Sequence, residues 1–319
     1  MTNWVALSNE NYPRRDFGCV LVDSHRVLVC GGQNEETGLK SAFIWNCETK
    51  SSTEIADLPT EIAFCRAVFL DGYAYAMGSN TNFFRINVND SSSSWERMSA
   101  SRPVGAGFAL VVSGKRIYQT GGYLMPNSMN SYDPDTDKWE QEPNMPNGLR
   151  GHDSVEVNGE IYVIGGLTVP DNHVTGDVSI FGIEGVWKVG PKAPRHSMDH
   201  SLTVTGTNII MIGGQPGRVV DPISTVYVLD TWAKKWTVHS DQASLPKSST
   251  CHRAIATNYQ LFVFGGCAER DSNTKEFRNY SESIFVIDLS AFGQSNDGAT
   301  EPLRPESTTS HKPKFLCFC

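Results

Sequence analysis

The segment EVNGEIYVIGG (156–166) contains the pattern that decides the fold. Two β-rich runs flank Asn158-Gly159, a dipeptide that accepts positive φ angles and closes two-residue hairpins. The second run ends in a glycine pair. This ending recurs in four other segments, and a sixth has Ser79 in place of the second glycine. The first glycines of the six copies are Gly31, Gly78, Gly121, Gly165, Gly213 and Gly265. Their spacing of 43 to 52 residues predicts a repeat architecture.

Each copy continues with a four-strand pattern. Asp71-Gly72 and Ser113-Gly114 supply the tight turn in two further copies. After the glycines, a loop leads to a third apolar run, 129–132 in the third copy, and a polar turn leads to a fourth. The tryptophans that open the fourth run are Trp95, Trp139, Trp187 and Trp236. Short alternating runs with Gly and Pro between them, and without a helical period, predict antiparallel all-β structure.

The two ends of the pattern complement each other. The sixth copy stops after its third run (284–289), whereas the chain opens with NWVALS (3–8), a tryptophan run with nothing before it. Pairing these two segments closes a ring and removes two exposed sheet edges. We therefore expect residues 3–8 to supply the fourth strand of the last repeat.

The glycine pair, a large residue three positions before it and a later tryptophan recur in register over residues 3 to about 290. This pattern resembles the kelch-repeat family. The resemblance implies a six-bladed β-propeller with four antiparallel strands per blade, closed by the N-terminal strand. Blade one departs from the pattern, with Ser51-Ser52 where its tryptophan should fall. Because a buried tryptophan contributes about 3 kcal/mol or more, we expect blade one to be the weakest.

The composition argues against several function classes. The 319 residues carry a formal net charge of −8 without a dense Lys/Arg run, whereas nonspecific nucleic-acid binding needs basic clusters to neutralise phosphates. We find no signal peptide and no stretch near the roughly 18 apolar residues of a membrane span. The eight cysteines lack paired metal-ligand spacing in the repeats. They predict reduced thiols in a cytoplasmic protein without a metal or cofactor.

The last residues differ from the repeats. We expect residues 1–290 to form the propeller and 291–319, rich in Ser, Thr, Pro and Gly, to be a disordered tail. The ending Cys317-Phe318-Cys319 resembles the signal on which Rab GTPases are prenylated. That modification depends on the GTPase fold, so an unmodified tail is favoured over lipidation of Cys317 and Cys319.

Function in a propeller falls to the loops at the ends of the ring. The resemblance implies a peptide-docking face, built from the loops that enter the first strand of each blade and those that follow the glycines. Arginines recur in the entering loops, and guanidinium groups bind carboxylates bidentately, which predicts an acidic peptide partner. The candidate partner-binding residues are Arg14, Arg15, Arg66, Arg102, Tyr123, Arg150, His173, Arg195, His196, Asp199, Arg218, Arg270 and Tyr280.

Two structural interpretations stay open beside these sites. The arginines lie 12 to 19 residues before their glycines, so they cannot all point alike, and any one of them can instead hold neighbouring blades together. His152, His200 and His252 each stand 13 residues before their first glycine, where Gly18, Cys65 and Phe108 stand in the other blades. Convergence on a metal is the sharper hypothesis for this column. A structural role is favoured, because equivalent residues are a whole blade apart.

The leading functional hypothesis is a non-catalytic interaction module: an adaptor, scaffold or substrate receptor. The chain has no BTB or F-box region before its first strand, so it resembles a lone kelch domain. The alternative is a kelch enzyme, a sialic-acid mutarotase-like isomerase acting on a small polar metabolite. Asp199, Arg195 and His196 would then supply its acid–base pair and pocket arginine.

Overall fold

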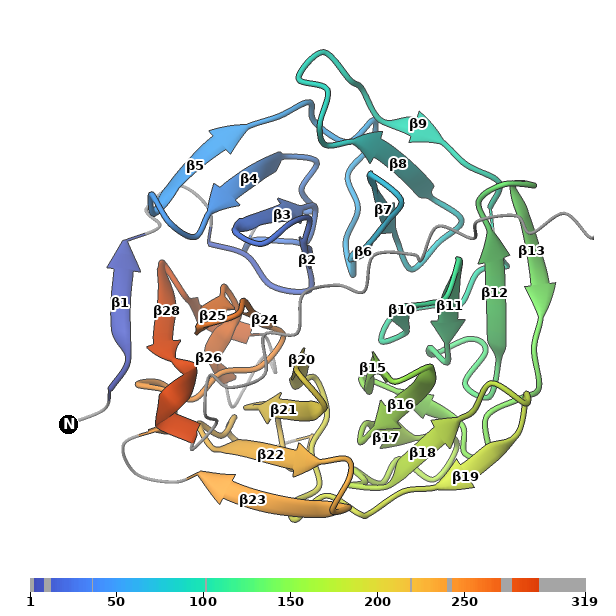
Figure 1. The fold of residues 1–319 in the computed structure, drawn as a ribbon, viewed down its shortest axis with the longest axis vertical. Coiled ribbons are helices and arrows are strands. Elements are labelled where there is room, and N and C mark those ends of the chain that lie inside the picture. The colour runs from blue at the N-terminus through green and yellow to red at the C-terminus, as the bar shows by residue number, and fades with distance from the viewer. Residues whose placement is uncertain are drawn as a thin grey trace, which may run out of the picture.

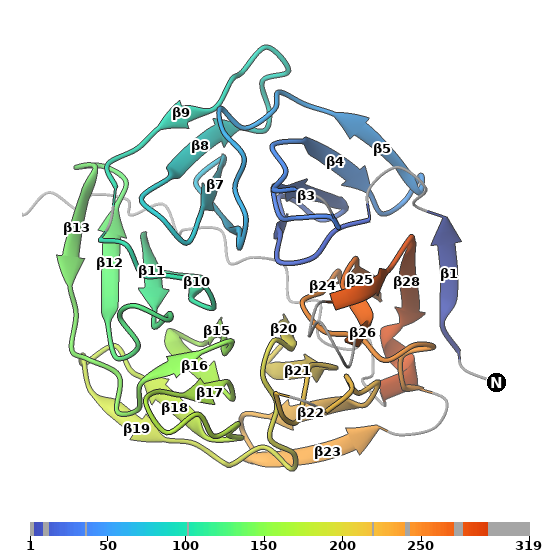
Figure 2. The same ribbon diagram turned by 180° about the vertical axis from the view of Figure 1, so that it is seen from behind.

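A computed structural model describes residues 3–8, 13–35, 37–100, 102–218, 220–239, 243–270 and 277–292. They form six four-stranded antiparallel sheets arranged around a central axis, as a six-bladed β-propeller (Figure 1). The same ring seen from behind is shown in Figure 2. Within each blade the first strand lies nearest the axis and the fourth forms the rim. The all-β, six-bladed prediction is confirmed.

The strands follow the repeat pattern. Blade one comprises β2 (Gly18–Leu21), β3 (Arg26–Cys30), β4 (Ala42–Asn46) and β5 (Ser51–Glu54). Blade two comprises β6 (Arg66–Leu70), β7 (Tyr73–Met77), β8 (Phe83–Asn87) and β9 (Glu96–Arg97). Blade three comprises β10 (Ala109–Ser113), β11 (Arg116–Thr120), β12 (Met129–Asp133) and β13 (Lys138–Gln141). Blade four comprises β15 (Asp153–Val157), β16 (Glu160–Ile164), β18 (Val178–Phe181) and β19 (Trp187–Val189). Blade five comprises β20 (Ser201–Thr205), β21 (Asn208–Ile212), β22 (Val226–Asp230) and β23 (Lys235–His239). Blade six comprises β24 (Arg253–Ala256), β25 (Gln260–Phe264), β28 (Ser283–Asp288) and β1 (Val5–Ser8).

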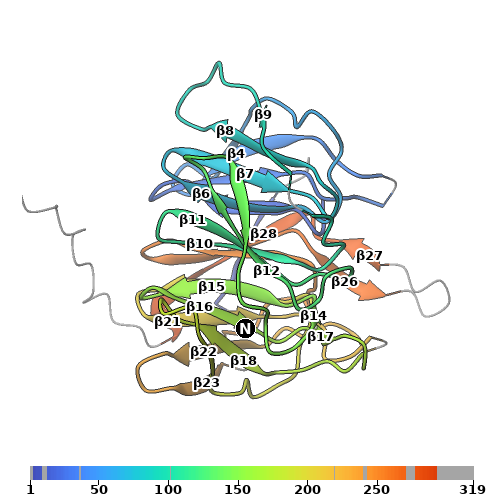
Figure 3. The same cartoon turned by 90° about the vertical axis from the view of Figure 1, so that its right-hand side faces the viewer.

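Two short ribbons decorate one side of the ring. The first pairs β14 (Leu149–Arg150) with β17 (Leu167–Thr168), and the second pairs β26 (Cys267–Arg270) with β27 (Phe277–Tyr280). Seen from the side in Figure 3, both lie at the same face of the disc. This face carries the loops that enter the blades and those that follow the glycines.

The N-terminal strand closes the ring. In the sheet order β1-β28-β25-β24, Val5 pairs with Val286 and Ser8 with Ser283. The Trp4 indole donates to the Ala243 carbonyl at 3.0 Å, in the segment that leaves blade five. The expected pairing of residues 3–8 with the last repeat is therefore confirmed.

The tryptophans of the fourth strands make one repeated contact. Each indole N–H donates to a backbone carbonyl in the segment that leaves the preceding blade: Trp95 to Ala56, Trp139 to Ser99, Trp187 to Pro143 and Trp236 to Pro191. In blade one, Ser52 faces Trp45 across β4 and β5, and Trp45 is almost fully buried against Phe264 of blade six. Blade one thus has its tryptophan on the third strand, which fills the seam that Ser52 leaves open.

The glycine pairs are structural, as the sequence predicts. Gly165 and Gly166 have φ angles of +66° and +94°. A Cβ on Gly165 would lie 2.8 Å from the His200 ring of the next blade, and one on Gly166 would lie 2.8 Å from Cβ of His152 in its own blade. Five blades share this left-handed pair, whereas Ser79 of blade two has no positive φ and its short loop returns at once. The first glycine therefore makes room for a residue of the next blade, and the second makes room for a residue of its own blade.

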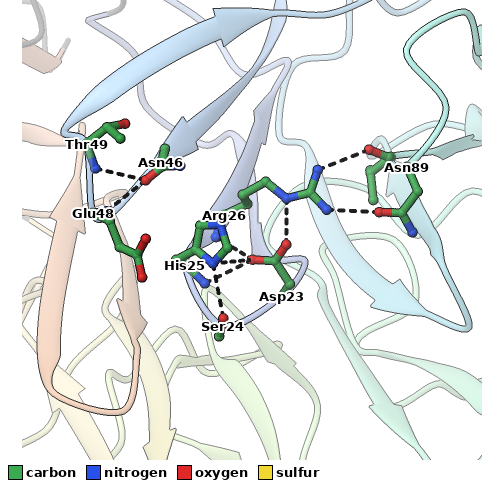
Figure 4. Close-up of polar contacts among 9 residues, drawn as sticks. Asp23, Ser24, His25, Arg26, Asn46, Glu48, Thr49 and Asn89 are labelled. Atoms are coloured by element: carbon green, nitrogen blue, oxygen red, sulfur yellow. Dashed lines mark hydrogen bonds and ion pairs between the residues drawn. The ribbon is translucent and has the colours of Figure 1, made fainter.

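Blade one differs in its first hairpin, which has three turn residues where the other blades have two (Figure 4). The Asp23 carboxylate accepts the backbone N–H groups of His25 (2.9 Å) and Arg26 (2.7 Å), and Arg26 reaches Asn89 of blade two at 2.9 Å. Because of this extra turn residue, counting 13 positions back from the first glycine gives a position one residue too late in blade one. Phe17, and not Gly18 as expected, therefore occupies the column of the three histidines.

A smaller correction concerns blade three. Ser113 pairs with Arg116, so its two turn residues are Gly114 and Lys115, one position later than predicted. Gly114 has the positive φ that the turn requires, at +59°.

The core lies between neighbouring sheets and continues past the last strand. A short 3-10 helix (Leu289–Phe292) follows β28 and buries Phe292 against His239, with 5.2 Å between ring centroids. Six buried cysteines in the described part of the chain are unpaired thiols. Among the described residues, no helix has the length and apolar character needed to cross a membrane. Cys317, Cys319 and the predicted tail from residue 293 lie outside the described residues.

Candidate functional site

A cavity of about 930 Å³ opens at the axis, on the face with the two short ribbons. All six blades contribute to its wall. The wall includes Arg15, Asp16, Glu35, Phe64, Gly107, Arg150, Gly151, Asp199, Gln215, Arg218, Cys251 and Tyr280. Five of the thirteen predicted residues are therefore brought together here: Arg15, Arg150, Asp199, Arg218 and Tyr280.

The wall of this cavity is held by backbone hydrogen bonds that pass from blade to blade. Gly151 donates to the Gly107 carbonyl, Asp199 to Gly151, Cys251 to Asp199 and Asp16 to Cys251, at 2.7 to 3.1 Å. All five residues have positive φ angles and stand at equivalent positions before the inner strands. The inner ends of the entering loops are thus fixed, so a ligand meets a preformed mouth.

Arg15 is already paired within the mouth. Its Nη1 lies 2.7 Å from the Asp16 carboxylate, and its Nε donates to the Tyr280 hydroxyl at 2.9 Å. The Tyr280 hydroxyl in turn donates to the Asn34 carbonyl at 3.3 Å. These contacts join blade six to blade one, and Asp16 neutralises the Arg15 charge.

Arg150 has a different environment. Its guanidinium carbon lies 5.4 Å from the centroid of the exposed Tyr123 ring, a cation–π contact. Its Nε is buried without a hydrogen-bond partner, and the ion pairs among the described residues do not include it. The backbone of Arg150 pairs with Leu167 in the β14–β17 ribbon, which fixes the base of the side chain. Arg150 therefore presents donors at the cavity from a fixed platform.

Asp199 brings a titratable group to the same wall. Burial raises its pKa to about 6, and the nearby Asp16 carboxylate acts in the same direction. The guanidinium groups of Arg66, Arg150 and Arg253 oppose this rise. Asp199 is therefore mostly ionised at neutral pH and loses its charge in mild acid.

The other predicted residues are not brought into the cavity wall. Arg14 is buried and donates to the Gly31 carbonyl at 3.0 Å, and Arg66 is buried near the axis. Arg102, Tyr123, His173, Arg195 and His196 are exposed outside the wall. The Arg270 side chain lies outside what the structure describes. Asp199, Arg195 and His196, the alternative acid–base trio, are thus not assembled at one place, and His196 lies near Asp177.

Gln215 is one of the wall residues that sequence reasoning missed. Gln215 is fully buried, and neither polar atom of its amide has a hydrogen-bond partner within the described part of the chain. It directly follows the glycine pair of blade five, as Gln33 follows that of blade one, and each pairs with an entering loop. Its position directly after the glycine pair is the sequence feature that could have identified it as a wall residue.

The histidine column is buried between blades. Burial lowers the pKa of His152 and His200 to about 4 and that of His252 to about 3. His152 shares a hydrogen bond with the Thr120 hydroxyl at 2.9 Å. Among the described residues, no three His, Cys, Asp or Glu side chains come together to hold a metal. The rings instead pack over the glycines of the preceding blades.

Comparison with known proteins decides the family. The Kelch motif model matches residues 13–59 and 105–146, and each matched segment contains one complete four-stranded blade. The chain is a kelch-repeat protein. This kelch chain is 25% identical to Kelch-like protein 15 of Danio rerio, over 61% of its length and 34% of that protein.

Two further relatives agree with this assignment. Kelch-like protein 25 of Xenopus tropicalis is 21% identical over 80% of this kelch chain and 37% of its own length. Kelch domain-containing protein 8B of Mus musculus is 25% identical over 49% of this chain and 46% of its own length. The kelch chain thus spans between a third and a half of the length of each of these three relatives.

Proposed function

We propose that this kelch propeller is a non-catalytic interaction module, which binds a peptide segment of a protein partner at the axial mouth. The observation that carries the proposal is Arg150, a guanidinium on the wall of the cavity that takes part in none of the ion pairs among the described residues. A carboxylate of the peptide would accept two hydrogen bonds from the guanidinium fork. The Tyr123 ring packs against the Arg150 guanidinium, which restricts the orientation of the fork, and it offers the peptide an apolar contact.

The charge distribution of the mouth selects where an acidic side chain docks. Arg15 is neutralised by Asp16, so a carboxylate gains little on that side. Arg150 and Arg218 lie on blades four and five, and we place the acidic side chain of the partner between them. The peptide would act as the recognition element of a scaffold, adaptor or substrate receptor in the cytoplasm, a location that the unpaired cysteine thiols fit.

A displayed random-peptide library tests this proposal, with the purified kelch chain as bait. We expect the recovered peptides to be enriched in Glu and Asp, and Arg150→Ala to weaken their binding at least about tenfold. Arg150→Lys should give an intermediate loss, since it keeps the charge without the fork. Fluorescence polarisation of labelled peptides measures the affinities.

Arg195→Ala is the matched control, because Arg195 is exposed and lies outside the cavity wall. It should leave the affinity and the melting temperature unchanged. Peptides without acidic enrichment, or with equal affinity for the wild type and Arg150→Ala, would refute the proposal.

A further inference from the structure

The wall of the axial cavity has a charged side and an apolar side. Within the described part of the chain, its charged side chains all come from blades one, four and five. Blades two and three, which lie side by side in Figure 1, contribute Phe64, Ala106 and Gly107. Among the described wall residues, this side therefore has no charged or hydrogen-bonding side chain, and Phe64 is its one large group.

The Phe64 ring is not a core side chain. The residue is partly exposed, and it belongs to none of the hydrophobic clusters that the described residues form between the sheets. Ile62 and Cys65, close to it in the chain, are instead almost fully buried in the cluster that joins blades one and two. Ligand pockets are typically lined by such aromatic side chains, with a few polar groups that fix the orientation of the ligand.

The backbone at Phe64 is left-handed, with a φ of +52°. The equivalent residues of the other blades also have positive φ angles: Asp16, Gly107, Gly151, Asp199 and Cys251. Glycine and aspartate adopt this conformation readily, whereas a bulky residue is strained in it. The Cys65 N–H donates to the Asp16 carbonyl at 2.7 Å, which holds the loop in this form. The fold thus requires the left-handed backbone but not the phenylalanine, and strained residues of this kind are frequent at binding sites.

The apolar side of the wall borders Arg150. A Cβ built on Gly107 would lie 3.1 Å from the Arg150 Cβ, and the Tyr123 ring packs against the guanidinium. Tyr123 and the adjoining Leu124 are 59% and 57% exposed, and the Tyr123 N–H donates to the carbonyl of the wall residue Ala106 at 2.9 Å. Blades two and three therefore present apolar groups both on the wall and at its rim, next to the guanidinium proposed to bind the acid.

We propose that the mouth recognises a two-part motif in its peptide partner: an acidic residue at Arg150 and a large apolar residue that packs against Phe64. This inference rests on the proposed peptide-binding function, and it adds the class of residue that accompanies the acid. The carboxylate pairs with the guanidinium fork, whereas the apolar side chain gains free energy by leaving water. Because the fold holds both wall groups in place, the two peptide residues have a fixed separation.

Peptides selected with the purified kelch chain test the motif directly. We expect Phe, Leu, Ile or Met to be enriched at one fixed offset from the enriched Glu or Asp. Replacing that apolar residue of a selected peptide by Ser should weaken its binding about tenfold. Acidic enrichment without an apolar position would overturn this inference and leave the proposed function intact. Absence of acidic enrichment would refute the proposed function and, with it, the two-part motif.

Phe64→Asn assigns the apolar position to the ring, since asparagine tolerates a positive φ. This variant should bind the apolar peptide and its Ser counterpart almost equally, whereas Arg150→Ala should weaken both and keep their ratio. Tyr259→Asn is the matched control and should keep the wild-type ratio, because Tyr259 is 60% exposed and lies outside the cavity wall. Fluorescence polarisation measures these affinities. A tenfold ratio that survives in Phe64→Asn would overturn the proposal.

Thermal unfolding separates a binding ring from a structural one. Because the ring lies outside the core clusters and asparagine suits the φ of +52°, Phe64→Asn should melt at or above the temperature of the wild type. A lower melting temperature would show that the ring stabilises the fold, which contradicts the proposal. Should the asparagine variant fail to fold, Phe64→Gly gives the same test, since this φ carries no penalty for glycine.

Discussion

Blades one to three and blades four to six fill the same place beside the axis with different chemistry. Phe17, Cys65 and Phe108 occupy it in the first half, and His152, His200 and His252 in the second. The Phe17 ring lies 2.7 Å from a Cβ built on Gly265, and the His200 ring lies 2.8 Å from one built on Gly165. The fold therefore accepts a phenyl ring, an imidazole ring or, in blade two, a smaller thiol at this place.

The three buried histidines affect the stability of the fold in acid. The folded histidines have pKa values of about 3 to 4, against an ordinary value of 6.5. Below pH 6.5 the unfolded chain binds protons that the folded chain does not, so stability falls as the pH falls from 6.5 towards 4. Asp199 acts oppositely, because its raised pKa lets the folded state bind a proton first below pH 6.

The largest predicted effect is a loss of unfolding free energy in acid, to which the histidines of blades four to six contribute and their counterparts in blades one to three do not. From pH 7.5 to 5, the three histidines should cost about 6 kcal/mol of unfolding free energy and Asp199 should return about 1 kcal/mol. Urea unfolding at both pH values measures the difference. His200→Phe, which places the ring type of Phe17 in blade five, should remove about a third of the histidine loss. A histidine variant with the acid sensitivity of the wild type would contradict this account.

The second prediction contrasts the glycine pair of blade four with Gly78-Ser79 of blade two. Gly166→Ala should destabilise blade four by about 3 kcal/mol, because its φ of +94° is strained for alanine and the new Cβ meets His152. Ser79→Gly in blade two should cost only about 0.5–1 kcal/mol, since Ser79 has no positive φ. Equal losses, measured by urea unfolding at pH 7.5, would show that the two loops do not differ as described.

The sequence predicts the architecture well, because the fold repeats its requirements. The glycine pairs, the Asn158-Gly159 type of hairpin and the indole contacts each follow from a local geometry that recurs in most blades. The closing strand follows from counting the runs. The expected weakness of blade one remains a prediction, and Trp45, one strand away from the usual position, bears on it.

The site is harder to predict than the fold. Whether an arginine reaches the cavity depends on its offset from the inner strand, so Arg14 turns to backbone carbonyls while Arg150 faces the mouth. The three-residue turn after Val22 depends on the bonds that Asp23 makes, and a spacing count therefore places Gly18 one position wrongly. The burial of Gln215, whose amide has no hydrogen-bond partner among the described residues, has no signature in the sequence.

The smallest predicted effect asks whether the acid response of the interior extends to the mouth. Because Asp199 is mostly ionised at pH 7.5 and acts on Arg150, its charge opposes an incoming carboxylate. Asp199→Asn should strengthen binding of acidic peptides about threefold at pH 7.5, and wild-type affinity should rise towards the variant's as the pH falls to 5.5. Asp177→Asn is the control, since Asp177 pairs with Lys192 at 2.9 Å outside the cavity wall. A wild-type affinity that falls in mild acid while the protein stays folded would show that the charge of Asp199 does not control peptide binding at the mouth.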